Sequence, residues 1–110
     1  MKNRLTSTMA LIALAAFATT ATADTKKGGK IDGKKEFQEH CVECHANGGN
    51  LIKPGKSLKK KDREASGVKT ATDIIGLMRN PGPGMTKFDT KTISDKEARA
   101  IADYIIKTFK

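Results

Sequence analysis

Apolar residues recur at intervals of three and four positions over much of the chain, which is the spacing of one buried helix face. The clearest stripe follows a capping box formed by Ser94 and Glu97, with Ile93 and Ala98 placed as a hydrophobic staple. The stripe then continues to the C-terminus through Ala98, Ile101, Ala102, Ile105 and Phe109. We therefore predict a long helix that begins after Ser94.

A second amphipathic stripe lies in the middle of the chain. Thr70 and Asp73 have the form of a capping box with aspartate at the fourth place. The apolar positions behind this cap keep the helical spacing, through Ala71, Ile74, Ile75 and Met78. Pro81 should end this helix because proline lacks a backbone N–H and clashes with the preceding turn. The segment Pro81–Gly84 then predicts a stiff connector with no helix.

Two further helices are predicted nearer the N-terminus. The first begins near Gly33, carries Phe37 and Cys41 four positions apart, and ends at the turn-forming segment Asn47–Asn50. The second is short and highly charged, and it runs from Ser57, as its cap, to Ala65. No segment alternates polar and apolar residues as a strand would. The pattern therefore predicts an all-α fold with about four short helices.

The first residues have the form of a secretory signal peptide. Lys2 and Arg4 precede the apolar run Met9–Ala18, and Ala21–Ala23 forms an A-x-A cleavage site. We expect cleavage near Ala23, so that residues 1–23 are the signal peptide and residues 24–110 form one domain in the periplasm. A retained N-terminal anchor is the alternative, although the apolar run is short for a bilayer span. After cleavage we expect no stable membrane insertion.

The chain is basic, with a formal net charge of +9, of which Lys2 and Arg4 contribute two charges. A basic exported domain can meet nucleic acid, anionic lipid or an acidic protein face. Aromatic residues are few and no nucleic-acid motif is present, so we expect acidic protein partners and no nucleic acid. The run Lys59–Lys61 serves either such docking or solubility alone.

The strongest chemical signal is the pentapeptide Cys41–His45, a C-x-x-C-H motif typical of covalent haem attachment. On a helix, Cys41, Cys44 and His45 share one face, so both thiols can form thioethers with the haem vinyl groups. His45 can then bind the iron as the proximal ligand. A redox dithiol would be expected to follow a strand, and a zinc site at the cysteines would need further ligands.

The second axial ligand must come from elsewhere in the chain. Met78 lies on the apolar stripe of its helix, so we assign it to the core. Met85 follows the Pro–Gly connector outside any predicted helix, where a loop can carry a thioether to the iron, although it could instead fill a gap. His40 adjoins Cys41 and should stay on the proximal side or at the edge. We therefore predict Met85 as the second ligand.

These motifs resemble class I cytochromes c. The pattern of Gly33, Phe37, Cys41, Cys44 and His45 is similar to that family's N-terminal helix. In the family, the glycine and aromatic residue of this helix pack against an aliphatic and an aromatic residue of the last helix. Ile101 and Tyr104 fill those positions here. The loop after the motif, followed by Lys56–Lys60, is similar to the short cytochrome c6 branch, and the resemblance extends over residues 30–109.

The resemblance implies the cytochrome c fold wrapped around one covalently bound haem c with its iron. In the cytochrome c6 branch, a proline commonly follows the axial methionine, whereas Thr86 stands there in this chain. The resemblance also implies haem packing by residues near Leu51, Ile52, Ile75 and Phe88.

We expect the protein to be a monomeric, non-enzymatic carrier of one electron between larger redox proteins. One alternative is a peroxidase-like haem enzyme, which would need catalytic groups on the open side of the haem. Arg79 is near the Met85 loop, but we expect it to hold a haem propionate or cap its helix. The other alternative is a redox or gas sensor in which Met85 leaves the iron.

Overall fold

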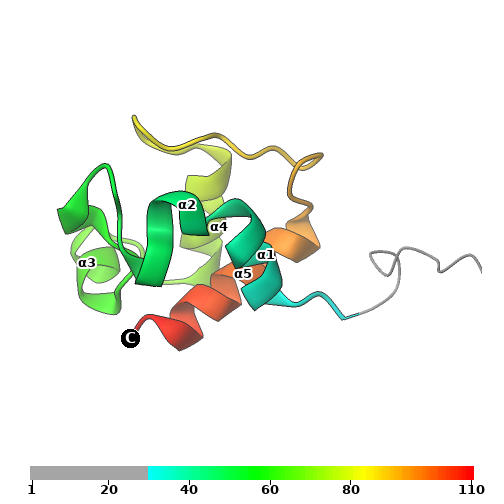
Figure 1. Ribbon diagram of the computed structural model, residues 1–110, viewed down its shortest axis with the longest axis horizontal. Helices are drawn as coiled ribbons and strands as arrows, with labels where there is room; N and C mark the ends of the chain where they lie inside the picture. Colours follow the sequence, from blue (N-terminus) through cyan, green and yellow to red (C-terminus); the bar gives the residue numbers. More distant parts are fainter. Residues whose placement is uncertain (1–29) are drawn as a thin grey trace, which may run out of the picture.

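The computed structural model describes residues 30–110, and within this range it contains α-helices, 3-10 helices and no strand (Figure 1). The α-helices are α1 (Gly33–His40), α2 (Val42–His45), α3 (Lys60–Ala65), α4 (Ala71–Arg79) and α5 (Asp95–Thr108), and the 3-10 helices are η1 (Ala46–Gly48) and η2 (Pro54–Lys56). The predicted all-α fold is confirmed. The predicted signal peptide, residues 1–23, lies outside the described residues.

The two strongest helix predictions rest on local capping, and both are confirmed. At the start of α4, the Thr70 hydroxyl accepts the Asp73 N–H at 3.2 Å and the Asp73 carboxylate accepts the Thr70 N–H at 2.9 Å. Hydrogen bonds from the backbone N–H groups of Thr70 and Lys69 lower the pKa of the Asp73 carboxyl below its usual range. Ser94 and Glu97 form the same reciprocal pair at the start of α5. Each cap satisfies N–H groups that the first helical turn leaves without partners.

The structure differs from the prediction in two other helices. The first helix is interrupted at Cys41, which has φ −122° and separates α1 from α2, although the Cys41 N–H still bonds to Phe37. The charged helix α3 begins at Lys60 and not after Ser57. Ser57 does not cap it, because its hydroxyl donates to the Asp62 carboxylate at 2.5 Å and accepts the Lys59 N–H.

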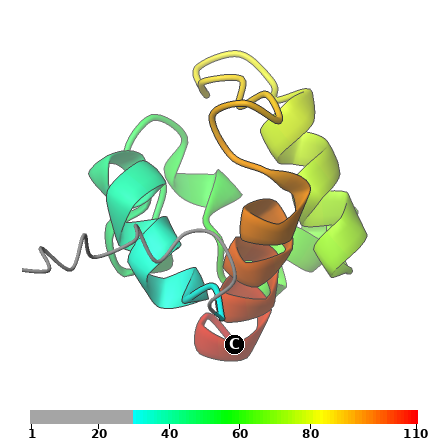
Figure 2. The same cartoon turned by 90° about the vertical axis from the view of Figure 1, so that its right-hand side faces the viewer.

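The core is centred on the contact between α1 and α5, and α4 packs against α5 as well (Figures 1 and 2). Phe37 of α1 is buried, and its ring centroid lies 5.3 Å from that of Tyr104. Ile101 of α5 is fully buried in the same cluster. Met78 of α4 is also buried, as its place on the apolar stripe predicts.

The end of α5 is tied to three other parts of the chain. The Phe109 ring lies 5.5 Å from the Phe37 ring, and its carbonyl accepts the N–H of Lys60 at 3.0 Å. The Phe109 ring also packs against Gly48, where an added Cβ would lie 2.5 Å from the nearest ring carbon. Because Gly48 has φ +74°, this turn favours glycine for its backbone as well as for its lack of a side chain.

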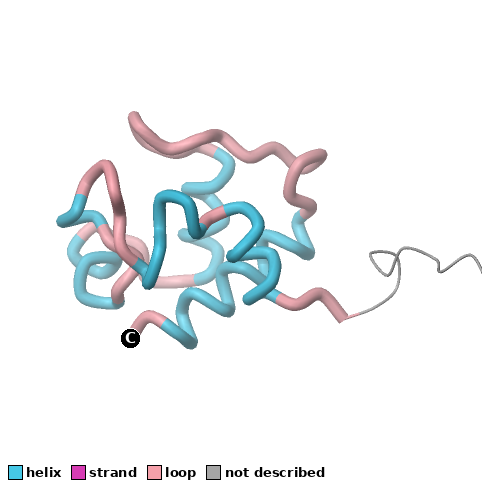
Figure 3. Tube along the Cα trace, in the orientation of Figure 1, coloured by secondary structure: helices cyan, strands magenta, loops and turns pink. Residues whose placement is uncertain are grey.

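A long loop, residues 80–94, connects α4 to α5 and contains no helix. It runs along the top of Figures 1 and 3, apart from the α1–α5 contact. The loop begins with Pro81 and carries Met85 and Phe88 before it reaches the cap at Ser94. The α2 turn and this loop are therefore two separate segments, and both are attached to the helices that form the core.

The crossing of α1 and α5 leaves no space for a side chain at Gly33. A Cβ added there would lie 2.1 Å from the Ala100 carbonyl oxygen and 3.1 Å from Tyr104 Cβ. We expect Gly33→Ala to push α1 away from α5 and to lower the free energy of unfolding by about 3 kcal/mol, the upper part of the usual range for overpacking. Chemical denaturation followed by circular dichroism measures this change.

Gly76→Ala is the matched control. Gly76 lies inside α4, is exposed, and has no atom within 4 Å of an added Cβ. This substitution should raise the free energy of unfolding by up to about 1 kcal/mol because alanine is the better helix former. Similar changes for the two variants would contradict the close crossing at Gly33.

Candidate functional site

Two adjoining cavities open between the α2 turn and the loop that follows α4. Their volumes are about 130 and 310 Å³, and both are lined by Cys41, His45, Met85 and Phe88. Cys44 lines the smaller cavity. The structure therefore brings the predicted site residues Cys41, Cys44, His45 and Met85 together in one cleft, although Met85 is distant from the others in the sequence.

The two cysteines have different surroundings and do not form a disulfide. Cys41 is half-buried against the core, and burial raises the pKa of its thiol to about 11. Cys44 is exposed at the cleft. A thiol with so high a pKa stays protonated at neutral pH and is a poor partner for thiol–disulfide exchange. This environment disfavours the dithiol alternative.

The His45 ring is held by a hydrogen bond from its own turn. Its Nδ1 lies 2.7 Å from the Gly49 carbonyl oxygen, which can only accept, so Nδ1 carries the proton. Nε2 is then the nitrogen with a free lone pair, which is the form that binds a metal. The carbonyl reaches Nδ1 because the chain reverses at Asn47, which has φ +54°, and at Gly48.

Sequence reasoning did not identify Gly49 as a partner of His45. The Asn47–Asn50 segment signals a turn, but the interaction uses a backbone carbonyl that any residue supplies. Asn50 also stabilises this turn. Its side chain accepts hydrogen bonds from the N–H groups of Ile52 and Lys53 and donates one to the Lys56 carbonyl. Asn50 and Lys53 line both cavities.

Met85 lies in the loop between α4 and α5, outside any helix, as the connector predicts. Gly84 immediately before it has φ +94°, a backbone conformation that favours glycine. The Phe88 N–H donates to the Met78 carbonyl at 2.9 Å, which joins the far side of the loop to α4. The loop thus places Met85 at the cleft while 37% of the residue remains exposed.

Arg79 holds this loop, a role that the sequence did not predict. One guanidinium nitrogen, Nη1, donates to the carbonyls of Phe88 at 3.1 Å and Ile93 at 2.9 Å. The other, Nη2, pairs with the Asp95 carboxylate at 2.8 Å. Arg79 thus joins the end of α4 to the loop and to the start of α5, while its predicted contact with a haem propionate stays a prediction.

The predicted haem-packing residues are only partly at the cleft. Ile52 lines the smaller cavity and Phe88 lines both, whereas Leu51 and Ile75 line neither. Leu51 is 77% exposed, and Ile75 packs against the core. Sequence analysis missed the apolar wall of the larger cavity, which is formed by Leu58, Val68, Ile74, Leu77, Met78 and Ile105. The helical spacing of Ile74 and Met78 marked them as core without showing that they border a cavity.

Comparisons with known proteins agree with this arrangement. The family profile described as cytochrome c oxidase, cbb3-type, subunit III matches residues 30–105. Cytochrome c6 from Rippkaea orientalis is 32% identical over 90 residues, which cover 82% of this chain and 80% of that protein. A cytochrome c6-like protein from Nostoc sp. is 28% identical over 98 residues, covering 89% of this chain and 87% of that protein.

The chain belongs to the class I cytochromes c. It is a small monohaem protein of the cytochrome c6 type, and its cofactor is one covalently bound haem c with iron. Among solved structures, outer membrane cytochrome F from Geobacter sulfurreducens has a TM-score of 0.69 at 40% identity, over 71% of this chain and 99% of that chain. Cytochrome c6C from Synechococcus sp. PCC 7002 has a TM-score of 0.65 at 30% identity, over 70% and 93% of the two chains.

Three features of the cleft itself fit a haem, independently of the comparisons. The only two cysteines of the chain adjoin it, the His45 ring is fixed with Nε2 free, and an apolar wall faces the same space. Such a wall favours burial of a large apolar ring.

None of the helices in residues 30–110 combines the length and apolar character that a membrane span requires.

Arg79→Met should loosen the loop that carries Met85. The variant loses three hydrogen bonds and leaves two loop carbonyls without their donor, so we expect the free energy of unfolding to fall by about 2 kcal/mol. The Phe88 amide should also exchange its hydrogen faster, as measured by NMR. Arg99→Met is the control, because Arg99 pairs with Asp103 on the exposed surface of α5, where ion pairs contribute less than about 1 kcal/mol. Equal effects of the two substitutions would contradict a special role for Arg79.

Proposed function

We propose that this cytochrome carries single electrons between larger redox proteins in the periplasm, with His45 and Met85 as the axial ligands of its haem. Cys41 and Cys44 would form the two thioether bonds. The observation that carries the proposal is the meeting of His45 and Met85 at one cleft from two independent segments. One segment is the turn around α2, and the other is the loop held by Arg79.

The two ligands have complementary effects on the site. The bound haem supplies an iron that changes reversibly between two oxidation states. The hydrogen bond from His45 Nδ1 to Gly49 increases the basicity of the ring and fixes its orientation. The Met85 thioether is a soft ligand that favours the reduced iron, and histidine–methionine ligation therefore raises the reduction potential. Met85 would also occupy the coordination position that oxygen or peroxide needs.

The structure gives no support to the peroxidase-like or sensor alternatives. A peroxidase needs an available histidine or arginine on the open side of the haem. His40 directly precedes Cys41 of the attachment motif, and the Arg79 guanidinium is engaged with the loop and Asp95. A sensor would need a loop that releases Met85 readily, whereas this loop is joined to α4 and α5 by Arg79. We therefore propose a non-enzymatic carrier.

The compartment and domain boundaries are part of the same proposal. Residues 1–23 would act as a signal peptide cleaved near Ala23, and residues 24–110 would form the single haem domain. We further propose that the protein acts as a monomer. The described elements support a single domain, because α1, α4 and α5 share one hydrophobic core.

The cleft edge suggests how a partner would dock. Ile52 and Met85 line the cleft and are exposed, which provides an apolar contact area beside the haem. Lys53 and Lys56 are exposed and line the larger cavity, whereas the run Lys59–Lys61 lines neither cavity. We propose that the cleft lysines, more than that run, attract the acidic face of a partner.

Met85→Ala tests the axial ligand. The oxidised wild-type protein should show the weak far-red absorption band of iron–methionine ligation and sharp α and β bands on reduction with dithionite. The variant should lose the far-red band and have a lower midpoint potential, because a thioether no longer favours the reduced iron. Met78→Leu is the control, because it removes the other methionine at the cavities while roughly conserving volume in their apolar wall, and it should keep the far-red band. A far-red band that survives Met85→Ala would refute the proposed ligand.

Lys53→Gln tests the docking surface. Hexacyanoferrate(III) serves as an anionic oxidant, and its reaction with the reduced protein is followed by stopped-flow absorption. We expect the rate to fall as salt rises, and we expect Lys53→Gln to lower the low-salt rate about two- to threefold. Lys61→Gln removes the same charge from α3, away from the cleft, and should change the rate less. A salt-independent rate, or equal effects of both variants, would reject steering by the cleft lysines.

A further inference from the structure

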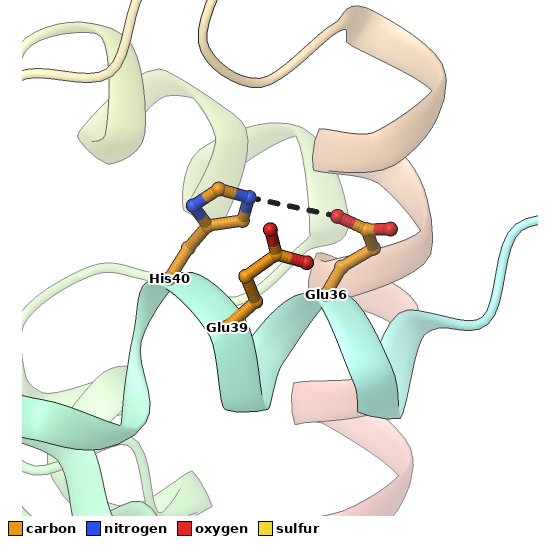
Figure 4. A group of neighbouring side chains, drawn as sticks. All are labelled: Glu36, Glu39 and His40. Atoms are coloured by element: carbon orange, nitrogen blue, oxygen red, sulfur yellow. Dashed lines mark ion pairs between the residues drawn. The ribbon is translucent and has the colours of Figure 1, made fainter. Parts of the chain in front are cut away.

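Helix α1 carries a cluster of potential metal ligands that are not among the proposed haem ligands. Glu36, Glu39 and His40 stand on one side of the helix, because positions i, i+3 and i+4 are neighbours on a helix surface (Figure 4). One ligand atom from each residue lies within 4.8 Å of the other two. The three side chains therefore converge without any change in the backbone.

Glu36 is the unusual member of this cluster. The residue is only 7% exposed, and its buried Oε2 atom has no hydrogen-bond partner among residues 30–110. Among the described residues its ion-pair neighbour is His40, whose Nε2 lies 3.6 Å from Oε2, and Figure 4 shows this carboxylate oxygen turned toward the ring. A buried carboxylate oxygen without a donor is unfavourable, because it has lost its water and gained no replacement. A bound cation would supply the missing interaction.

We propose that Glu36, Glu39 and His40 form a binding site for a divalent cation of the zinc class. Two ligands about 2.0 Å from a tetrahedral zinc ion lie roughly 3.3 Å from each other. The separation of 3.6 Å between Glu36 Oε2 and His40 Nε2 is close to that value and is too long for a good hydrogen bond. Glu39 is exposed, so its side chain can close the remaining distance by a rotamer change.

The ligand types select the ion. An imidazole nitrogen with two carboxylates is a set that zinc accepts, with water in the fourth position. Calcium and magnesium prefer six or more oxygen ligands, and the imidazole offers none. The site should therefore take zinc in preference to calcium.

The cluster lies next to the haem cleft, but none of its residues is a proposed axial ligand. His40 directly precedes Cys41 and lines the smaller cavity, and its ring centroid lies 6.2 Å from that of Phe88. A zinc ion bound here would cancel the charge of two carboxylates at this side of the cleft. The proposal depends on α1 alone and stands whether or not Met85 is an axial ligand.

Isothermal titration of the untagged, haem-loaded protein with zinc chloride tests the site. We expect one equivalent of zinc to bind, and each of Glu36→Gln and His40→Gln to weaken binding at least about tenfold, the loss usually seen even for partners of metal ligands. Zinc should also shift the His40 ring signals in NMR spectra of the reduced protein. Calcium chloride should give no saturable binding under the same conditions.

Glu64→Gln provides the matched control. Glu64 also lies on a short helix and pairs with Lys60 at i−4, but it has no histidine in its ion pair. Its loss should leave zinc binding unchanged. If Glu36→Gln does not fold, as judged by circular dichroism, the exposed Glu39→Gln variant decides the question. Absence of saturable zinc binding, or binding that His40→Gln and Glu39→Gln leave intact, would overturn the proposal.

Discussion

The close crossing of α1 and α5 is the contact on which the rest of the structure depends. Gly33 allows the α1 backbone to approach Ala100, and Phe37 packs against Tyr104 beside the crossing. Because α1 leads directly into Cys41, the crossing sets where the haem-attachment segment stands relative to the core. Helix α4 packs on the same α5 and carries the loop with Met85. The two sides of the cleft are thus aligned through one shared helix.

Features determined by neighbouring residues could be predicted from the sequence, and features that depend on distant partners could not. The capping boxes at Thr70 and Ser94 involve residues three positions apart, so their sequence pattern was sufficient. The interruption at Cys41 has no local breaker such as proline, and it was missed. The start of α3 was misplaced because Ser57 uses its hydroxyl for Asp62.

The same distinction applies to the candidate site. The C-x-x-C-H motif and the loop position of Met85 led to four residues that the structure gathers at one cleft. The groups that support them were not visible in the sequence. His45 is oriented by the carbonyl of Gly49, and the loop is held through carbonyls of Phe88 and Ile93, which carry no residue-specific signal. The wall of the larger cavity was also missed, because periodicity separates buried from exposed positions but not core from cavity lining.

The ties made by Phe109 have a consequence for the order in which the chain can fold. Its ring packs on Phe37 and Gly48, and its carbonyl accepts the N–H of Lys60, so three earlier segments find their partner near the end of the chain. Contacts between residues far apart in sequence form late, because they require closure of a long loop. During synthesis the aromatic cluster cannot close until Phe109 has emerged. Until α5 has emerged, α1 lacks the helix against which it packs.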